Sequence, residues 1–135
     1  MVRPAPTFKR SLLAGFLAGI ASGITGNLLA AAISSVTDKH FPELSPLWIG
    51  FTAMFVNLAG GVFFYALARW TTRPRYHFVL VALSLAILDS VLVWVRMPPG
   101  FGVIAAPTHF LVALIAIVMV PKLALATRQS RLSEA

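Results

Sequence analysis

The chain has no cysteine, few charged residues and very few acidic ones. The lack of cysteine excludes disulfide bonds, thiol nucleophiles and Cys-ligated metal sites. Only 11% of the residues are charged and 59% are hydrophobic, whereas an average soluble domain has roughly a quarter charged and about half apolar residues. A chain of 135 residues with this composition is too apolar for one soluble core, so we expect a single transmembrane domain over residues 1–135.

Acidic residues are outnumbered by basic ones, four Asp and Glu against 11 Lys and Arg. A net charge of +7 in a soluble protein would suggest a nucleic-acid partner. Here the basic residues flank long apolar runs, which is where membrane proteins place them. We therefore expect a lipid bilayer, and no nucleic acid, as the surroundings of this chain.

Four long apolar runs are separated by short polar segments, at about residues 11–36, 46–68, 78–95 and 105–125. Runs of this length predict membrane-spanning helices, so the expected fold is an all-α, integral membrane four-helix bundle. Ser45 and Pro46 form a helix start, in which serine caps and proline occupies the first turn. The first run is too long for the apolar region of a signal peptide, and we read it as a true span. Residues 1–8 and 127–135 are expected to be short disordered tails.

The basic residues are distributed unevenly between the two sides of these runs. Only Lys39 and Arg96 fall on one side, and the remaining Lys and Arg residues fall on the side of the termini and the second connection. The positive-inside rule then predicts that both termini are cytoplasmic.

Small residues recur at helical spacing in the first two runs. Gly15, Gly19 and Gly23 are four residues apart, and Gly60 and Gly61 lie one turn from Asn57 in the second run. Small residues on one ridge let membrane helices approach closely. We expect these glycines to pack helices inside the bundle, and a homodimer interface is the alternative for the ridge of the first run.

Four polar residues inside the runs are candidates for chemistry: Asn27, Asn57, Asp89 and His109. Counting residues from the run ends places them in the outer half of the bilayer, so we expect them to line one polar pocket. Arg96 lies seven positions after Asp89, on nearly the same helical face, and is a candidate counter-ion or gate.

Asp89 has the strongest claim to a function, because a charged carboxylate in hydrocarbon must be protonated, paired or hydrated. It could bind a proton or a cation, with His109 relaying or orienting. Alternatively, Asp89 forms a structural ion pair or hydrogen bond between the third and fourth helices. Asn27 and Asn57 are equally consistent with hydrogen bonds that only join helices.

Cofactor and metal sites find little support in the sequence. His77 and His109 are expected at opposite ends of the bundle, which disfavours a haem held by two histidines of one chain. No His and carboxylate share the i,i+3 or i,i+4 spacing of a helical metal site. We expect no cofactor, no metal and, in the absence of a catalytic signature, no enzymatic activity.

The opening Ala14-Gly15 and Ala18-Gly19 leads to Asn27-Leu28-Leu29, and Thr108-His109 opens the last apolar helix. In these features and in layout, the chain resembles the DUF6069 group of short bacterial four-span membrane proteins. The resemblance implies a multi-pass protein of the bacterial cytoplasmic (inner) membrane and supplies no activity.

Two functions from different classes follow from these observations. The first is a small membrane protein that binds or transports a small ligand or ion through a polar pocket centred on Asp89, with a homodimer or another homo-oligomer enclosing the path. The second is a non-catalytic accessory or scaffold subunit of a membrane complex, whose polar residues serve helix packing only. A lipid-modifying enzyme ranks third.

Overall fold

The computed structural model describes residues 5–126 and contains four long helices joined by short connections. Their bounds are α1 Phe8–Thr37, α2 Pro46–Trp70, α3 Pro74–Arg96 and α4 Phe101–Leu125, with a short 3₁₀ helix, η1, at Pro42–Leu44. The all-α prediction is confirmed. The helices extend beyond the predicted runs by a few residues: basic and aromatic residues extend α1, α2 and α3, and α4 begins four residues earlier, at Phe101. Phe8 is thus helical rather than part of a tail, and the other predicted tail residues that lie in 1–4 and 127–135 are outside the described residues.

The helix starts follow local capping chemistry. The Thr7 hydroxyl accepts from the backbone N–H of Arg10, at 3.3 Å, and the Ser45 hydroxyl accepts from that of Trp48, at 3.4 Å. Each bond satisfies a donor that the first turn leaves free. Pro74 begins α3, and Gly100 precedes α4 with a φ of 90°, a conformation that glycine adopts without strain.

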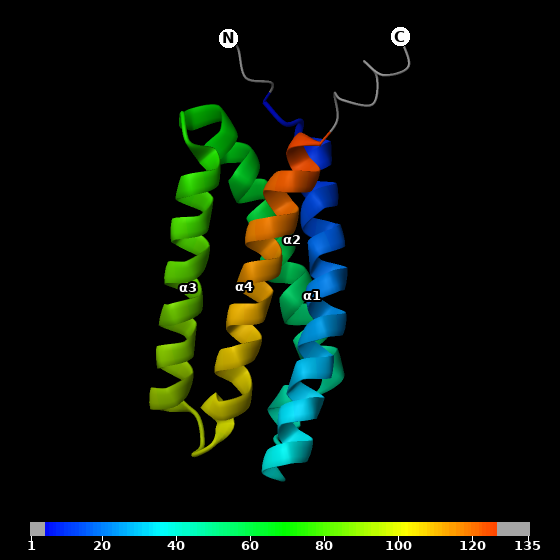
Figure 1. The fold of residues 1–135 in the computed structure, drawn as a ribbon, viewed down its shortest axis with the longest axis vertical. Helices are drawn as coiled ribbons and strands as arrows, with labels where there is room; N and C mark the ends of the chain where they lie inside the picture. Colours follow the sequence, from blue (N-terminus) through cyan, green and yellow to red (C-terminus); the bar gives the residue numbers. More distant parts are fainter. Residues whose placement is uncertain (1–4, 127–135) are drawn as a thin grey trace.

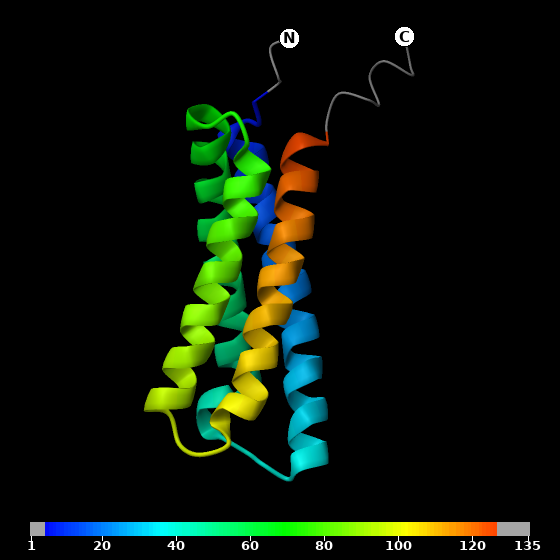
Figure 2. The same cartoon turned by 60° about the vertical axis from the view of Figure 1, so that its left-hand side comes forward.

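Helices α1, α2 and α4 pack against one another, while α3 lies to one side (Figure 1). Helix α3 runs along α4 and meets α2 mainly where a short connection joins the two. Figure 2 shows α3 and α4 side by side, with α1 beyond α4. Helix α1 begins at Phe8 and α4 ends at Leu125, and both of these helix ends lie at the same end of the molecule as the α2–α3 connection.

Two aromatic contacts lie near the two ends of α3. Close to the α2–α3 connection, the buried Phe78 ring stacks edge-on against Phe64 of α2, with ring centroids 5.4 Å apart. At the other end, Gly102 of α4 lies against Trp94, and a Cβ added at this glycine would be 2.6 Å from the indole ring. Helix α3 is therefore packed along α4 and meets α2 mainly at the end near Phe78.

Glycines mediate the close approach of α1 and α2. A Cβ at Gly15 would clash with the backbone oxygen of Asn57, and one at Gly61 with the backbone oxygen of Ser11. A Cβ at Gly19 would be 2.7 Å from the Met54 sulfur. The glycine ridge of α1 is thus buried within the chain. Helix α2 covers this ridge, so the structure gives no support to a homodimer through it.

All four long helices are long and apolar enough to cross a membrane. Their outward surfaces carry many exposed Leu, Ile, Val and Phe side chains, as lipid contact requires. Six basic residues of the described chain lie at the end that holds Phe8 and Leu125. We call this the basic end; its residues are Lys9, Arg10, Arg69, Arg73, Arg75 and Lys122.

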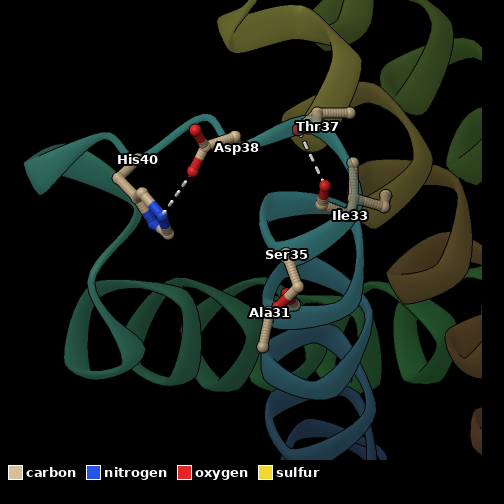
Figure 3. Close-up of polar contacts among 6 residues, drawn as sticks. All are labelled: Ala31, Ile33, Ser35, Thr37, Asp38 and His40. Carbon is tan, nitrogen blue, oxygen red and sulfur yellow. Dashed lines mark hydrogen bonds and ion pairs between the residues drawn. The ribbon is translucent and has the colours of Figure 1, made fainter.

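The opposite end is formed by the connections 38–45 and 97–100, which touch each other where Lys39 lies against Gly100. Helix α1 ends with Asp38 in the left-handed conformation, at a φ of 52°. Figure 3 shows the exposed pair of Asp38 and His40, in which Oδ1 and Nε2 are 4.0 Å apart, and the Thr37 hydroxyl that donates to the Ile33 carbonyl. An exposed pair at this distance contributes little stability.

Candidate functional site

A groove lies between α2 and α3, with α4 as its floor. Its volume is about 800 Å³. It extends from Phe63 and Phe78 near the basic end to Glu43, Met97 and Phe101 at the opposite end. The groove exists because α3 touches α2 only near the basic end, so the two helices diverge toward the opposite end (Figure 1).

The groove is predominantly apolar. Alanine, valine, leucine and phenylalanine make up most of its walls, and α2 contributes the small residues Ala59 and Gly60. Aromatic rings narrow it near the basic end, where the ring centroids of Phe63 and Phe78 are 6.4 Å apart. A concave apolar surface with a few polar groups is typical of a site for a small molecule.

Asp89 and His109 are brought together on the walls of this groove. Each lies about two turns from the connection 97–100, Asp89 before it on α3 and His109 after it on α4, so the antiparallel helices place them at one level. The carboxylate of Asp89 is close enough to act electrostatically on the His109 ring. This is the pair that the sequence proposed.

Asp89 is exposed rather than buried, which differs from the expected pocket centred on it. The next residue, Ser90, takes the buried position facing the bundle, and its hydroxyl donates to the Ala86 carbonyl at 2.7 Å. Since adjacent residues on a helix point about 100° apart, Asp89 is turned toward the groove. Within residues 5–126 Asp89 forms no hydrogen bond and no ion pair, with Arg96 or with any other side chain.

His109 is half-buried, and its Nδ1 has no hydrogen-bond partner among the described residues. It follows Thr108, whose hydroxyl donates to the Ile104 carbonyl within α4. The ring therefore lines the groove without a protein partner that would fix its tautomer.

The other predicted pocket residues lie elsewhere. The amide of Asn27 donates to the carbonyls of Gly23 and Pro46, at 2.8 and 3.1 Å, and so joins α1 to the start of α2. Arg96 is exposed at the end of α3 and does not line the groove. The expectation of one pocket containing all of these residues is wrong, because Asn27 and Asn57 lie at the contact of α1 with α2 and Arg96 lies at the end of α3.

Asn57 is fully buried between α1 and α2. Its amide donates to the Ser22 hydroxyl at 3.2 Å and to the Ala53 carbonyl at 2.8 Å, and its Oδ1 has no partner in the described part of the chain. Asn57 thus links the two helices beside the glycine contact at Gly15.

Two further polar residues of the groove were not singled out from the sequence, Glu43 and Thr52. Thr52 lies on the face of α2 that also carries Val56, Ala59 and Phe63, at spacings of four, seven and eleven. This spacing shows that the four residues share one face of α2. It does not show that this face lines a groove, because that depends on which helices pack against α2. In residues 5–126 no three His, Asp or Glu side chains are close enough together to hold a metal ion.

Comparison with known proteins identifies the family. Residues 3–126 match the family described as a family of unknown function, DUF6069. The chain belongs to the DUF6069 family. No curated protein and no solved structure matches it. For this DUF6069 protein, an account of function therefore depends on its own side chains.

Proposed function

We propose that this DUF6069 protein binds an amphiphilic, cationic small molecule in the groove between α2, α3 and α4. The apolar walls contact the body of the ligand, and Asp89 and His109 contact its polar group. The bilayer supplies the ligand laterally through the gap between α2 and α3. This is a binding function of a multi-pass membrane protein, and it requires no catalytic step.

One observation carries the proposal: Asp89 lines an apolar groove of about 800 Å³ and has no hydrogen-bond or ion-pair partner in residues 5–126. A carboxylate at membrane depth is costly unless something neutralises it. Arg96 does not do so, and His109 forms no ion pair with it. A cationic group of a ligand would satisfy Asp89, and the volume is within the range of small-molecule sites.

Two polar residues support the alternative of an accessory subunit. Asn27 and Asn57 both serve the packing of α1 on α2, as that alternative requires. Their role, however, concerns a part of the molecule away from the groove. It does not explain why the carboxylate of Asp89 has no partner within residues 5–126, which is why we favour ligand binding.

The test compares two probes of the same shape and opposite charge, tetraphenylphosphonium and tetraphenylborate. Binding to the detergent-purified full chain is measured by equilibrium dialysis. We expect the cation to bind at least tenfold tighter than the anion, since opposite unit charges about 6 Å apart attract by about 3 kcal/mol at an effective dielectric constant of about 20, and 1.4 kcal/mol is tenfold.

Asp89→Asn should remove most of this charge preference. Asp38→Asn is the matched control, because it makes the same chemical change at an exposed carboxylate outside the groove, where asparagine tolerates the left-handed backbone. Equal binding of the two probes, or an equal effect of the two substitutions, would reject the proposal and favour the accessory subunit.

A further inference from the structure

A second, smaller cavity lies on the other flank of α3, between α3 and α4 at the basic end. Its volume is about 290 Å³. Its lining residues are Arg75 and Val79 of α3 and Ile117, Val118, Pro121 and Lys122 of α4. This cavity shares no residue with the groove that contains Asp89.

The two basic side chains of this cavity lack acidic partners. No Asp or Glu of residues 5–126 lies at the basic end: Asp38 and Glu43 are at the opposite end, and Asp89 lies in the part of α3 nearer to that end. Neither Arg75 nor Lys122 forms an ion pair within the described residues. The cavity therefore has a positive charge on both walls that nothing in this part of the chain balances.

Below the charges, the cavity wall is apolar. Val79 is one turn from Arg75 on α3, and Val118 is one turn from Lys122 on α4. Both helices are long enough to cross a membrane, so the charged side chains lie at its surface and the valines lie deeper. A molecule that contacts both the basic side chains and the valines below them has an anionic head and an apolar tail.

Pro121 leaves one backbone carbonyl of α4 without its usual helical donor. It lies within α4, is buried, and has no N–H to donate to the carbonyl four residues earlier, that of Ile117. Ile117 itself lines the cavity.

We propose that this cavity binds the headgroup of an anionic phospholipid, with the phosphate between Arg75 and Lys122 and an acyl chain along Val79 and Val118. The cavity has about ten times the ~30 Å³ that one water molecule occupies in the liquid, which suits a phosphate with its glycerol but not the acyl chains. Basic cavities between membrane helices are known to bind such headgroups. The proposal does not depend on ligand binding at Asp89.

The experiment titrates the full chain in detergent with lipids and counts bound lipid by native mass spectrometry. The probes are dioleoylphosphatidylglycerol, which is anionic and carries hydroxyl groups, and dioleoylphosphatidylcholine, which has the same acyl chains and no net charge. We expect the first lipid to bind at least tenfold tighter. Equal binding of the two lipids would overturn the proposal.

The variant is the double substitution Arg75→Gln and Lys122→Gln. The chain offers a matched control, Lys9→Gln with Arg10→Gln, which removes one Lys and one Arg from the same end but outside the cavity. We expect the first pair to weaken phosphatidylglycerol binding about tenfold and the second to change it less than twofold. An equal loss in both would show a diffuse attraction to the basic end and reject a site.

Two further measurements complete the test. The exchange Arg75→Lys with Lys122→Arg keeps both charges and should retain binding, and circular dichroism should show the same helix content in all variants. Competition by inorganic phosphate distinguishes a site for a lipid phosphate from a site for free phosphate. If millimolar phosphate displaces the lipid and binds alone at the same residues, the site is one for a free anion and the lipid assignment is wrong.

Discussion

Gly15 of α1 lies so close to the backbone oxygen of Asn57 of α2 that a methyl group does not fit between the helices. Gly61 stands in the same relation to Ser11. These two contacts bring the backbones of α1 and α2 together without a bulky side chain between them. Where the hydrophobic effect is absent, such close packing is a main source of helix association.

Gly15→Ala is therefore expected to destabilise the bundle, by about 1–3 kcal/mol, because the added methyl group must push backbone away from backbone. The measurement is the free energy of unfolding in mixed micelles on addition of sodium dodecyl sulfate. Gly23→Ala is the control. A Cβ at Gly23 would be 3.5 Å from the Cα of Gly50, an ordinary contact, so this variant should be close to neutral. Equal effects at the two positions would contradict the packing argument.

Asn57 and Ser22 should be coupled energetically. Their hydrogen bond is buried between α1 and α2, at 3.2 Å. Interhelical hydrogen bonds in membranes contribute about 0.6 kcal/mol on average and up to about 1.7. A double-mutant cycle with Asn57→Ala and Ser22→Ala is expected to give a coupling energy in this range. Thr25, whose hydroxyl donates to the Ala21 carbonyl of its own helix at 2.7 Å, supplies the control partner, and its coupling to Asn57 should be near zero.

Asp89 and Arg96 should not be coupled, in contrast to Asn57 and Ser22. The sequence left open an ion pair between them, and the structure contains none within residues 5–126. Asp89→Asn, Arg96→Gln and the double variant are expected to have additive effects on the free energy of unfolding, within about 0.5 kcal/mol. A coupling energy above 1 kcal/mol would establish a structural ion pair and weaken the case for a ligand at Asp89.

The sequence predicted the helices well, since apolar runs of about twenty residues have one plausible structure in a bilayer. It also identified Asp89 and His109 as a pair, because both lie near the same connection. It did not reveal that Asn27 and Asn57 point away from this pair. The spacing of residues in the sequence predicts how deep a residue lies along its helix. Which helix it faces depends on how the four helices are arranged around one another.

The spacing of Thr52, Val56, Ala59 and Phe63 on one face of α2 was the sequence signal for the groove, and it does not say what that face meets. The groove arises because α3 runs along α4 and touches α2 mainly near Phe78, so that the rest of α3 stands away from α2. The residues that line it there are ordinary apolar ones, which in a membrane protein are equally suited to lipid or to another helix. Only the arrangement of the helices distinguishes a wall of the groove from the outer surface.

The orientation of the bundle is open to a direct test, since the chain contains no cysteine and a single one can be introduced without background labelling. The basic end carries six Lys and Arg residues of the described chain, against Lys39 and Arg96 at the opposite end. The positive-inside rule then predicts a cytoplasmic basic end.

His40→Cys, in the connection at the opposite end, should react with a membrane-impermeant maleimide added to intact spheroplasts. Thr72→Cys, in the α2–α3 connection, should react only after the membrane is broken. The reverse pattern would invert the bundle and place the cavity between Arg75 and Lys122 in the outer leaflet, and labelling of both positions in intact spheroplasts would mean a mixed orientation.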